Sequence, residues 1–279
     1  MKHIFTLFFI VLSFSFGKLY GQNNFSDTSG NIDVDGGGQL QYTLPIALPP
    51  GVKSVAPQIN VTYSSNSTNG VAGYGWNISG ITNITRSGKN LDKDGIIKGI
   101  DLNYNDFYSF NGQRLILVSG EYGKDGATYK TEKHSNLKIR SVGTLTGKDW
   151  FGPNYFEVTF EDGSQAWYGS TNTSDNNAST PVEYNIVKWK DVQGNYITYE
   201  YIRENNVSLI STISWGGNEI LSKPHFNSIV FNYKTRNKTE TSFLNGNNKG
   251  IPFVQRRILN EIIVNSNNSQ FKKIYLRTY

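Results

Sequence analysis

Apolar and polar side chains alternate along most of this chain, beginning near Gln39. Every second residue is apolar between residues 40 and 46 and again between residues 59 and 63. A period of two residues places alternate side chains on opposite faces of a β-strand. After the first 21 residues, no window of about 12 residues carries an apolar stripe at helical spacing. The pattern therefore predicts an all-β fold of antiparallel sheets and hairpins.

The clearest local signal is a predicted hairpin at residues 155–168. Phe156, Val158 and Phe160 would share one face of its first strand. Asp162-Gly163 would follow as a two-residue turn, because these residue types adopt the positive φ values that such a turn requires. Loop chemistry and strand periodicity thus agree in this segment.

A second turn at residues 191–195 precedes a strand with Ile197, Tyr199 and Tyr201 on one face. Further strands are expected at residues 229–233, 258–264 and 274–279. The last of these strands would form the edge of a sheet, which invites pairing with another strand. Either the charges of Lys272, Lys273 and Arg277 protect this edge, or the chain is one piece of a longer sheet.

The first 21 residues are predicted to be a secretory signal peptide. Lys2 supplies a positive charge, and residues 4–16 form an apolar run that is too short to span a bilayer. Cleavage fits after Gly17 or after Gly21, and we favour Gln22 as the mature start. We therefore expect a secreted, extracellular protein.

Three further segments follow from changes in composition. Residues 22–38 are rich in Gly, Asp, Ser and Asn and are predicted to form a flexible leader. Residues 39–170 and 181–279 are predicted to be two β-rich halves. The polar segment 170–180 between them is interpreted as a long exposed loop or a linker.

Composition excludes several classes of protein. Cysteine is absent, so the chain has no disulfides, zinc–thiolate sites or cysteine nucleophiles. The formal net charge of +5 includes Lys2 and Lys18, which would leave with the signal. We interpret the basic residues near the carboxyl end as solvated strand faces, because nucleic-acid binders concentrate their charge on one surface. We expect no nucleic-acid partner and no transmembrane segment in the mature chain.

Residues 36–86 carry a family resemblance. The matching motifs are Gly38-Gln-Leu-Gln-Tyr-Thr-Leu-Pro-Ile46, Pro49-Pro-Gly51, Pro57-Gln-Ile-Asn-Val-Thr-Tyr-Ser-Ser65, Asn69-Gly70, Gly73-Tyr-Gly-Trp76 and Ile84-Thr-Arg86. In order and spacing they resemble the amino-terminal domain of the Salmonella plasmid virulence protein B (SpvB) family, which is shared with the B components of insecticidal toxin complexes and with RHS/YD-repeat proteins. Weaker similarities follow at residues 106–112, 191–201 and 256–259.

The resemblance implies a structural signature made of thirteen residues. They are Gly38, Tyr42, Pro45, Ile46, Pro49, Gly51, Pro57, Tyr63, Gly70, Gly73, Gly75, Trp76 and Arg86. Some of these residues also have a physical reason. The prolines are expected to end an edge strand because they lack an N–H donor. Gly73 and Gly75 are expected to allow a tight turn before Trp76.

For function, the resemblance implies a module of a hollow β shell in a secreted toxin apparatus, so the sheets would form part of a larger β shell or a pair of β domains. The expected partners are other toxin-complex or RHS-type components. The ADP-ribosyltransferase domain of the family's namesake is not carried over, because that enzyme type needs an E-x-E pair and this chain contains none.

Candidate catalytic and metal-binding residues are sparse. His134 and His225 are the histidines outside the signal, and neither adjoins a G-x-S-x-G motif. We interpret both as exposed loop residues. Asp33-Val-Asp-Gly36 and Asp92-Lys-Asp-Gly95 begin like calcium loops but lack the glutamate at the twelfth position. We expect no catalytic residue, no metal and no cofactor.

The leading hypothesis is thus a secreted scaffold or shell module that is not an enzyme. The first alternative is a secreted carbohydrate-binding β-sandwich, in which aromatic rings stack on sugars. Its candidate residues are Trp76, Trp150, Trp167, Trp189 and Trp215. The second alternative is a secreted hydrolase with paired carboxylates, although the predicted hairpin places Glu157, Glu161 and Asp162 at the surface.

Overall fold

The computed structural model describes residues 29–171, 177–244 and 250–276. These residues form nineteen strands, a single-turn helix α1 (Leu91–Asp94) and a 3-10 turn η1 (Val52–Ser54). All strand pairings are antiparallel. The predicted all-β fold of antiparallel sheets and hairpins is confirmed.

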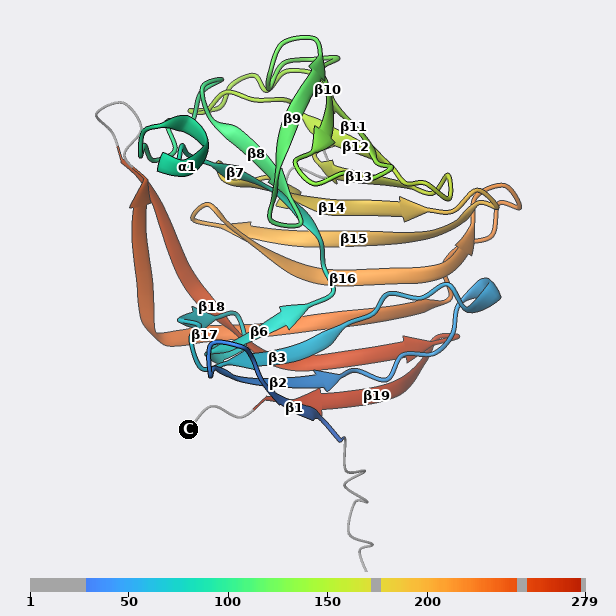
Figure 1. Cartoon of the computed structure of the whole chain (residues 1–279). Coiled ribbons are helices and arrows are strands. Elements are labelled where there is room, and N and C mark those ends of the chain that lie inside the picture. Colours follow the sequence, from blue (N-terminus) through green and yellow to red (C-terminus); the bar gives the residue numbers. More distant parts are fainter. Residues whose placement is uncertain (1–28, 172–176, 245–249, 277–279) are drawn as a thin grey trace, which may run out of the picture.

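The first sheet contains six strands in the order β1-β2-β3-β6-β5-β4. Their bounds are β1 (Asn31–Val34), β2 (Leu40–Pro45), β3 (Asn60–Ser64), β4 (Asn69–Gly70), β5 (Gly73–Tyr74) and β6 (Trp76–Ser79). In Figure 1 this sheet lies in front of the last strands of the second sheet.

The second sheet contains thirteen strands, and eight of them close into a barrel. The barrel strands are β7 (Asn83–Ser87), β8 (Phe107–Phe110), β9 (Gln113–Ser119), β10 (Thr128–Thr131), β11 (Lys138–Val142), β12 (Tyr155–Thr159), β13 (Gln165–Gly169) and β14 (Glu183–Lys190). Closure occurs because β14 pairs with β13 along one side and with β7 at the start of its other side. Figure 1 shows the barrel at the top of the molecule.

The remaining strands extend from the barrel as an open sheet. They are β15 (Asn195–Glu204), β16 (Val207–Asn218), β17 (Asn227–Leu244), β18 (Ile251–Ser266) and β19 (Ser269–Tyr275). The end of β14 pairs with β15, so one strand belongs to both the barrel and the open sheet. β17 and β18 form a long hairpin whose register shifts between Thr235 and Glu240.

One continuous apolar core joins the barrel to the two sheets. In the barrel it contains Phe156, Val158 and Tyr168, and between the sheets it contains Val61 and Trp215. Burial of this apolar surface is the main source of stability, since the chain has no cysteine for disulfides. The core therefore couples the amino-terminal part of the fold to the open sheet, as in the contact between Pro49 and Trp215, which are 166 residues apart in the sequence.

Both predicted hairpins are present, but one turn differs from the expectation. Residues 155–168 form β12 and β13, with Phe156 and Val158 fully buried. The turn has three residues rather than two, since Phe160 and Ser164 still bond across the hairpin. Only Gly163 has a positive φ, 81°. A type I turn followed by one left-handed glycine explains this geometry.

The amino-terminal part of the fold corrects two expectations. The predicted flexible leader contains strand β1, which pairs with β2 across a turn capped by Asp35. Residues 1–28, including the predicted signal peptide, lie outside the described residues. Pro45 ends β2 as predicted, but β2 is an inner strand between β1 and β3. The proline fits there because β1 reaches only to Thr43 and leaves the nitrogen of Pro45 without a neighbouring acceptor.

The later strands largely agree with the sequence. Ile197, Tyr199 and Tyr201 are all buried on one face of β15, as predicted. The last described strand runs over Ser269–Tyr275 and begins before the expected residues 274–279, of which 277–279 lie outside the described residues. The division into halves at 170–180 remains a prediction about domains. In the structure, β13 and β14 on its two sides pair with each other.

Candidate functional site

Seven of the thirteen signature residues lie in three separate places in the fold. The first is an aromatic cluster on the six-stranded sheet, where Tyr42, Tyr63 and Trp76 lie opposite one another on adjacent strands. The ring of Trp76 lies 5.9 Å from that of Tyr42 and 5.3 Å from that of Tyr63, measured between centroids. Gly75 has a φ of 78°, and a Cβ there would come within 2.5 Å of Tyr63. The predicted glycine turn before Trp76 is thus confirmed.

The second place is a seat for the Pro49-Pro-Gly51 motif on the open sheet. The carbonyl oxygen of Pro49 accepts a hydrogen bond of 3.0 Å from the indole nitrogen of Trp215. The carbonyl oxygen of Pro50 accepts one of 3.1 Å from Asn227. A Cβ on Gly51 would lie 3.0 Å from Trp215 Cδ1 and 2.0 Å from the oxygen of Val55. Only glycine therefore fits this close approach.

The third place is a buried polar cluster at one end of the barrel. Arg86, which is only 4% exposed, extends from β7 and binds three of the loops at that end. Its guanidinium donates to the carbonyl oxygens of Asn103 (3.1 Å), Phe151 (2.6 Å) and Pro181 (3.0 Å). It also forms an ion pair of 3.1 Å with Asp106.

Asp106 completes this cluster from the loop between β7 and β8. Its carboxylate accepts hydrogen bonds from the backbone nitrogens of Asp101 (2.7 Å) and Asn103 (3.2 Å). The Tyr108 ring lies 5.1 Å from the guanidinium of Arg86. Because every charged atom has partners, the ion pair is compatible with burial. We therefore assign Arg86 a structural role: it fixes the loops that close this end of the barrel.

Two tyrosine hydroxyls lie beside the same cluster. A Cβ on Gly152 would be 2.6 Å from the hydroxyl of Tyr184 and 2.8 Å from that of Tyr108, so both hydroxyls face this glycine. Burial raises the pKa of Tyr184 to about 12 and that of Tyr108 well above its ordinary value. Both hydroxyls therefore remain protonated at neutral pH.

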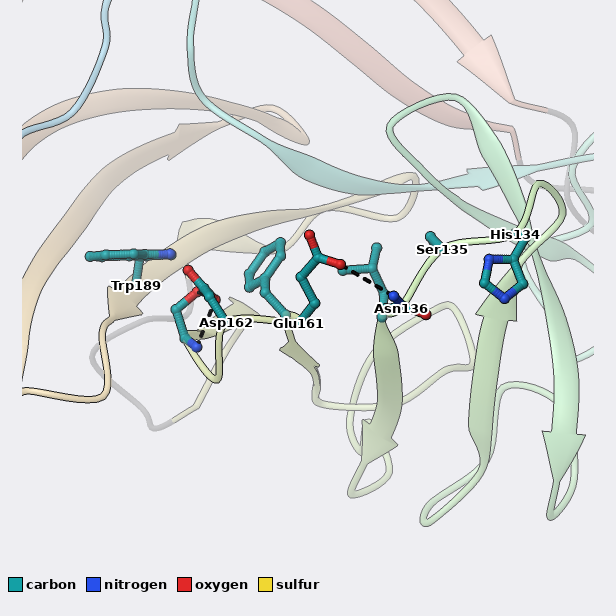
Figure 2. A pocket seen from close by; sticks show the side chains of 9 residues that line it. His134, Ser135, Asn136, Glu161, Asp162 and Trp189 are labelled. Carbon is teal, nitrogen blue, oxygen red and sulfur yellow. Dashed lines mark hydrogen bonds between the residues drawn. The ribbon is translucent and has the colours of Figure 1, made fainter.

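A pocket opens at the opposite end of the barrel, between the β10–β11 and β12–β13 connections (Figure 2). Its volume is about 690 Å³. Its lining residues are His134, Ser135, Asn136, Leu137, Phe160, Glu161, Asp162, Ser164 and Trp189. Figure 2 shows Trp189 next to Asp162, and His134 at the far end. The pocket combines apolar side chains with two carboxylates.

The two candidate histidines differ in their environments. His134 is exposed, as predicted, and lines the pocket. His225 is not an exposed loop residue, because its ring lies 4.1 Å from that of Tyr196, between centroids, and its Nδ1 accepts from the backbone of Gly217. Burial, together with the charge of Lys188, lowers its pKa to about 4. His225 is therefore neutral and has a structural role.

The acidic motifs lie in turns. Asp35 caps the β1–β2 turn, and Asp94 forms a bidentate pair with Arg114. No cluster of three histidine or acidic residues suited to a metal occurs among the described residues. Over the same part of the chain, none of the helices has the length and apolar character needed to cross a membrane.

Three strands have one neighbour each among the described residues and thus present sheet edges: β1, β4 and β19. β4 has only two residues, and the two longer edge strands are β1, which pairs with β2, and β19, which pairs with β18. Each of these two longer edges carries exposed apolar side chains: Ile32 and Val34 on β1, and Phe271 (55% exposed) and Tyr275 (63%) on β19. Figure 1 places both edges at the bottom of the molecule, away from the barrel. Unpaired edges with apolar side chains favour pairing with another polypeptide.

Comparisons with known proteins agree with this fold. The family model described as Salmonella virulence plasmid 65kDa B protein matches residues 34–215. The N-terminal domain of effector protein SpvB from Salmonella typhimurium strain LT2 is 14% identical over 79% of this chain and 86% of that one, with a TM-score of 0.57. No curated protein sequence is significantly similar to the chain.

Larger toxin proteins contain the same fold. A structure of TcdB2-TccC3-TEV matches 94% of this chain and 15% of its own, with 13% identity and a TM-score of 0.65. The Photorhabdus luminescens Tc holotoxin pore matches 85% of this chain and 13% of its own, with 13% identity and a TM-score of 0.55. This chain thus spans about one seventh of the length of these larger chains.

These matches define a toxin-complex-related β protein. The chain belongs to the SpvB family, because the family model covers more than half of its residues. The predicted family resemblance is confirmed. The sequence did not reveal the partners of the signature residues, such as Trp215 and Asp106, since these contacts join distant segments.

Proposed function

We propose that this chain is an exported scaffold or shell module of a toxin complex and is not itself an enzyme. Its partners would be other toxin-complex or RHS-type components. Support comes from the family match and from larger toxin chains that contain the same fold as a small part of their length. The observation that carries the proposal is the outer edge of β19, which pairs with no further described strand and on which Phe271 and Tyr275 are exposed on either side of Lys272 and Lys273.

A structural role also agrees with how the signature residues are used. Pro49 and Gly51 attach the first sheet to the open sheet, and Arg86 closes one end of the barrel. These contacts are hydrogen bonds from side chains to backbone carbonyl oxygens, together with close packing. The ring of His225 packs against Tyr196 and accepts a hydrogen bond from the backbone nitrogen of Gly217. The residues that identify the family thus hold the sheets and the barrel together, which is consistent with the proposed structural role.

The proposed role of the β19 edge in assembly can be tested by a substitution on that strand. Phe271→Lys removes an exposed aromatic side chain from this edge and adds a third lysine to Lys272 and Lys273. It should weaken assembly, because lysines on an edge strand oppose strand pairing. The full chain, coexpressed with the products of adjacent genes, should sediment as a joint species. The variant should shift at least half of the chain to the free form in sedimentation velocity.

Leu91→Lys is the matched control, since Leu91 is equally exposed but lies on α1, away from both edges. This control should sediment like the original chain. A chain that remains free beside every adjacent gene product would refute the scaffold proposal. Turnover of a substrate by the purified chain would refute the part of the proposal that says the chain is not an enzyme.

Export is tested separately by the mass of the protein recovered outside the cell. We expect a mature chain that begins at Gln22, or at Lys18 if cleavage follows Gly17. The signal should be removed because its apolar run is shorter than a membrane span. An intact Met1 on protein retained in the cytosol would contradict export without affecting the proposal of assembly.

A further inference from the structure

The five tryptophans of the chain occupy different environments, and only one lines the pocket at the barrel mouth. Trp215 and Trp150 are buried, at 0% and 7% exposed. Trp76 lies between two tyrosines, and Trp167 lies beside Lys188 and Lys190. Trp189 is partly exposed and belongs to the pocket lining. Its position on the described surface singles it out for ligand contact.

Strand register explains why Trp189 lies inside the barrel mouth. Trp189 on β14 is opposite Ala166 on β13, and cross-strand partners share a face of the sheet. Ala166 is fully buried in the barrel core, so Trp189 points toward the interior at the end of the barrel. Trp167, the next residue on β13, points to the outer face. The mouth of a barrel is a common place for small ligands.

The pocket has an apolar side formed by partly buried residues. Leu137, Phe160 and Trp189 all pack against the core and expose part of their surface to the pocket. Two of them are aromatic, and an aromatic ring offers a flat face to the C–H groups of a ligand. A ligand with a flat apolar side therefore fits this surface.

The polar side of the pocket presents hydrogen-bond acceptors. Glu161 Oε2 accepts from Asn136 at 3.2 Å, shown by a dashed line in Figure 2. Asp162 Oδ1 accepts from the side chain and the backbone of Ser164, and these bonds lower the pKa of Asp162. Among the described residues, Glu161 Oε1 and Asp162 Oδ2 have no such partner. They remain available to O–H donors.

Charge limits the chemistry of the ligand. No lysine or arginine lines the pocket, and Glu161 and Asp162 form no ion pair with any described residue. Two carboxylates without a cation repel anionic ligands. A neutral polyol avoids that repulsion, and its hydroxyls form charge-assisted bonds to carboxylates. Its ring C–H groups at the same time cover the aromatic side.

We propose that the barrel mouth binds a neutral saccharide, with a sugar ring on Trp189 and its hydroxyls donating to Glu161 and Asp162. This site is independent of the proposed assembly edge, because β19 does not contribute to the pocket. The module would thus carry a glycan-contact site in addition to its structural role.

The test is a titration of the full chain with cellotetraose, maltotetraose and chitotetraose, followed by tryptophan fluorescence and by calorimetry. At least one tetrasaccharide should bind. Glu161→Gln keeps an oxygen acceptor but removes the charge, and it should weaken binding about fivefold. Trp189→Ala should weaken binding by about tenfold or more, the equivalent of one lost stacking contact.

Two controls separate binding from folding. Trp167→Ala removes the neighbouring tryptophan on the outer face and should bind as the original chain does. Because Trp189 also packs on the core, thermal unfolding of each variant is measured beside its affinity. Equal loss in Trp189→Ala and Trp167→Ala would overturn the proposal. Failure of all three tetrasaccharides, or binding of arginine amide in their place, would overturn it as well.

Discussion

Replacing Arg86 with methionine is expected to lower the free energy of unfolding by about 3–5 kcal/mol, because the change leaves the carboxylate of Asp106 buried without its cation. Three carbonyl oxygens, from different loops, would also lose their donor. A loss of this size is a large part of the stability of an ordinary domain. Urea unfolding followed by tryptophan fluorescence measures it.

Arg140→Met is the matched control on the same barrel. Arg140 pairs with Glu157 on the surface, and its side chain is 47% exposed. Surface pairs contribute about 0–1 kcal/mol, so this variant should unfold almost as the original chain does. A double variant that also carries Asp106→Asn should recover part of the loss from Arg86→Met. Equal effects from Arg86→Met and Arg140→Met would contradict the assigned role of Arg86.

The second large effect is expected at Trp215. Trp215→Ala should cost about 3–5 kcal/mol, because it empties a fully buried site between the two sheets. Trp215→Phe retains most of the volume but leaves the carbonyl oxygen of Pro49 without its donor, at about 1–3 kcal/mol. Urea unfolding of both variants gives the two values.

The order of these effects is informative. Trp167→Ala, on the outer face of the barrel, should be milder than Trp215→Ala. If the phenylalanine variant at 215 were as stable as the original chain, the hydrogen bond to Pro49 would contribute nothing to the seat of the Pro49-Pro-Gly51 motif. The motif would then require a different explanation.

Much of the fold could be predicted from local sequence. The two-residue period identified strands such as β12 and β15, because one face of each is buried while the other contacts solvent. The glycines before Trp76 predicted a tight turn, and Gly73 and Gly75 do adopt positive φ values there. These features depend on neighbours within a few residues, which the sequence shows directly.

Long-range contacts could not be predicted. Nothing in the sequence around Arg86 indicated that its partners would come from three separate loops. Nothing around Pro49 indicated that its carbonyl oxygen would accept a hydrogen bond from Trp215. Strand β1 was missed because Asn31–Val34 has exposed side chains throughout, so burial imposes no period on it. Barrel closure depends on β14 pairing with strands from both directions along the chain.

The residues that line the pocket could likewise not be grouped from the sequence alone. Glu161 and Asp162 were correctly expected at the surface of a hairpin, but Trp189 is a β14 residue that follows them by more than twenty positions. Closure of the barrel brings these residues to one mouth. The tryptophans in the sequence therefore suggest sugar binding but do not show where a sugar would bind. The strand register shows that Trp189 and Trp167 lie on opposite faces of the sheet.

Hydrogen exchange of the β19 backbone tests the central claim most directly. The amides of Ser269–Tyr275 that point away from β18 should exchange quickly in the isolated chain, because no described strand pairs with that side. In complex with a toxin component they should become protected, while the barrel mouth remains unchanged. Unaltered exchange of β19 in a stable complex would contradict the claim that this edge joins the chain to its assembly.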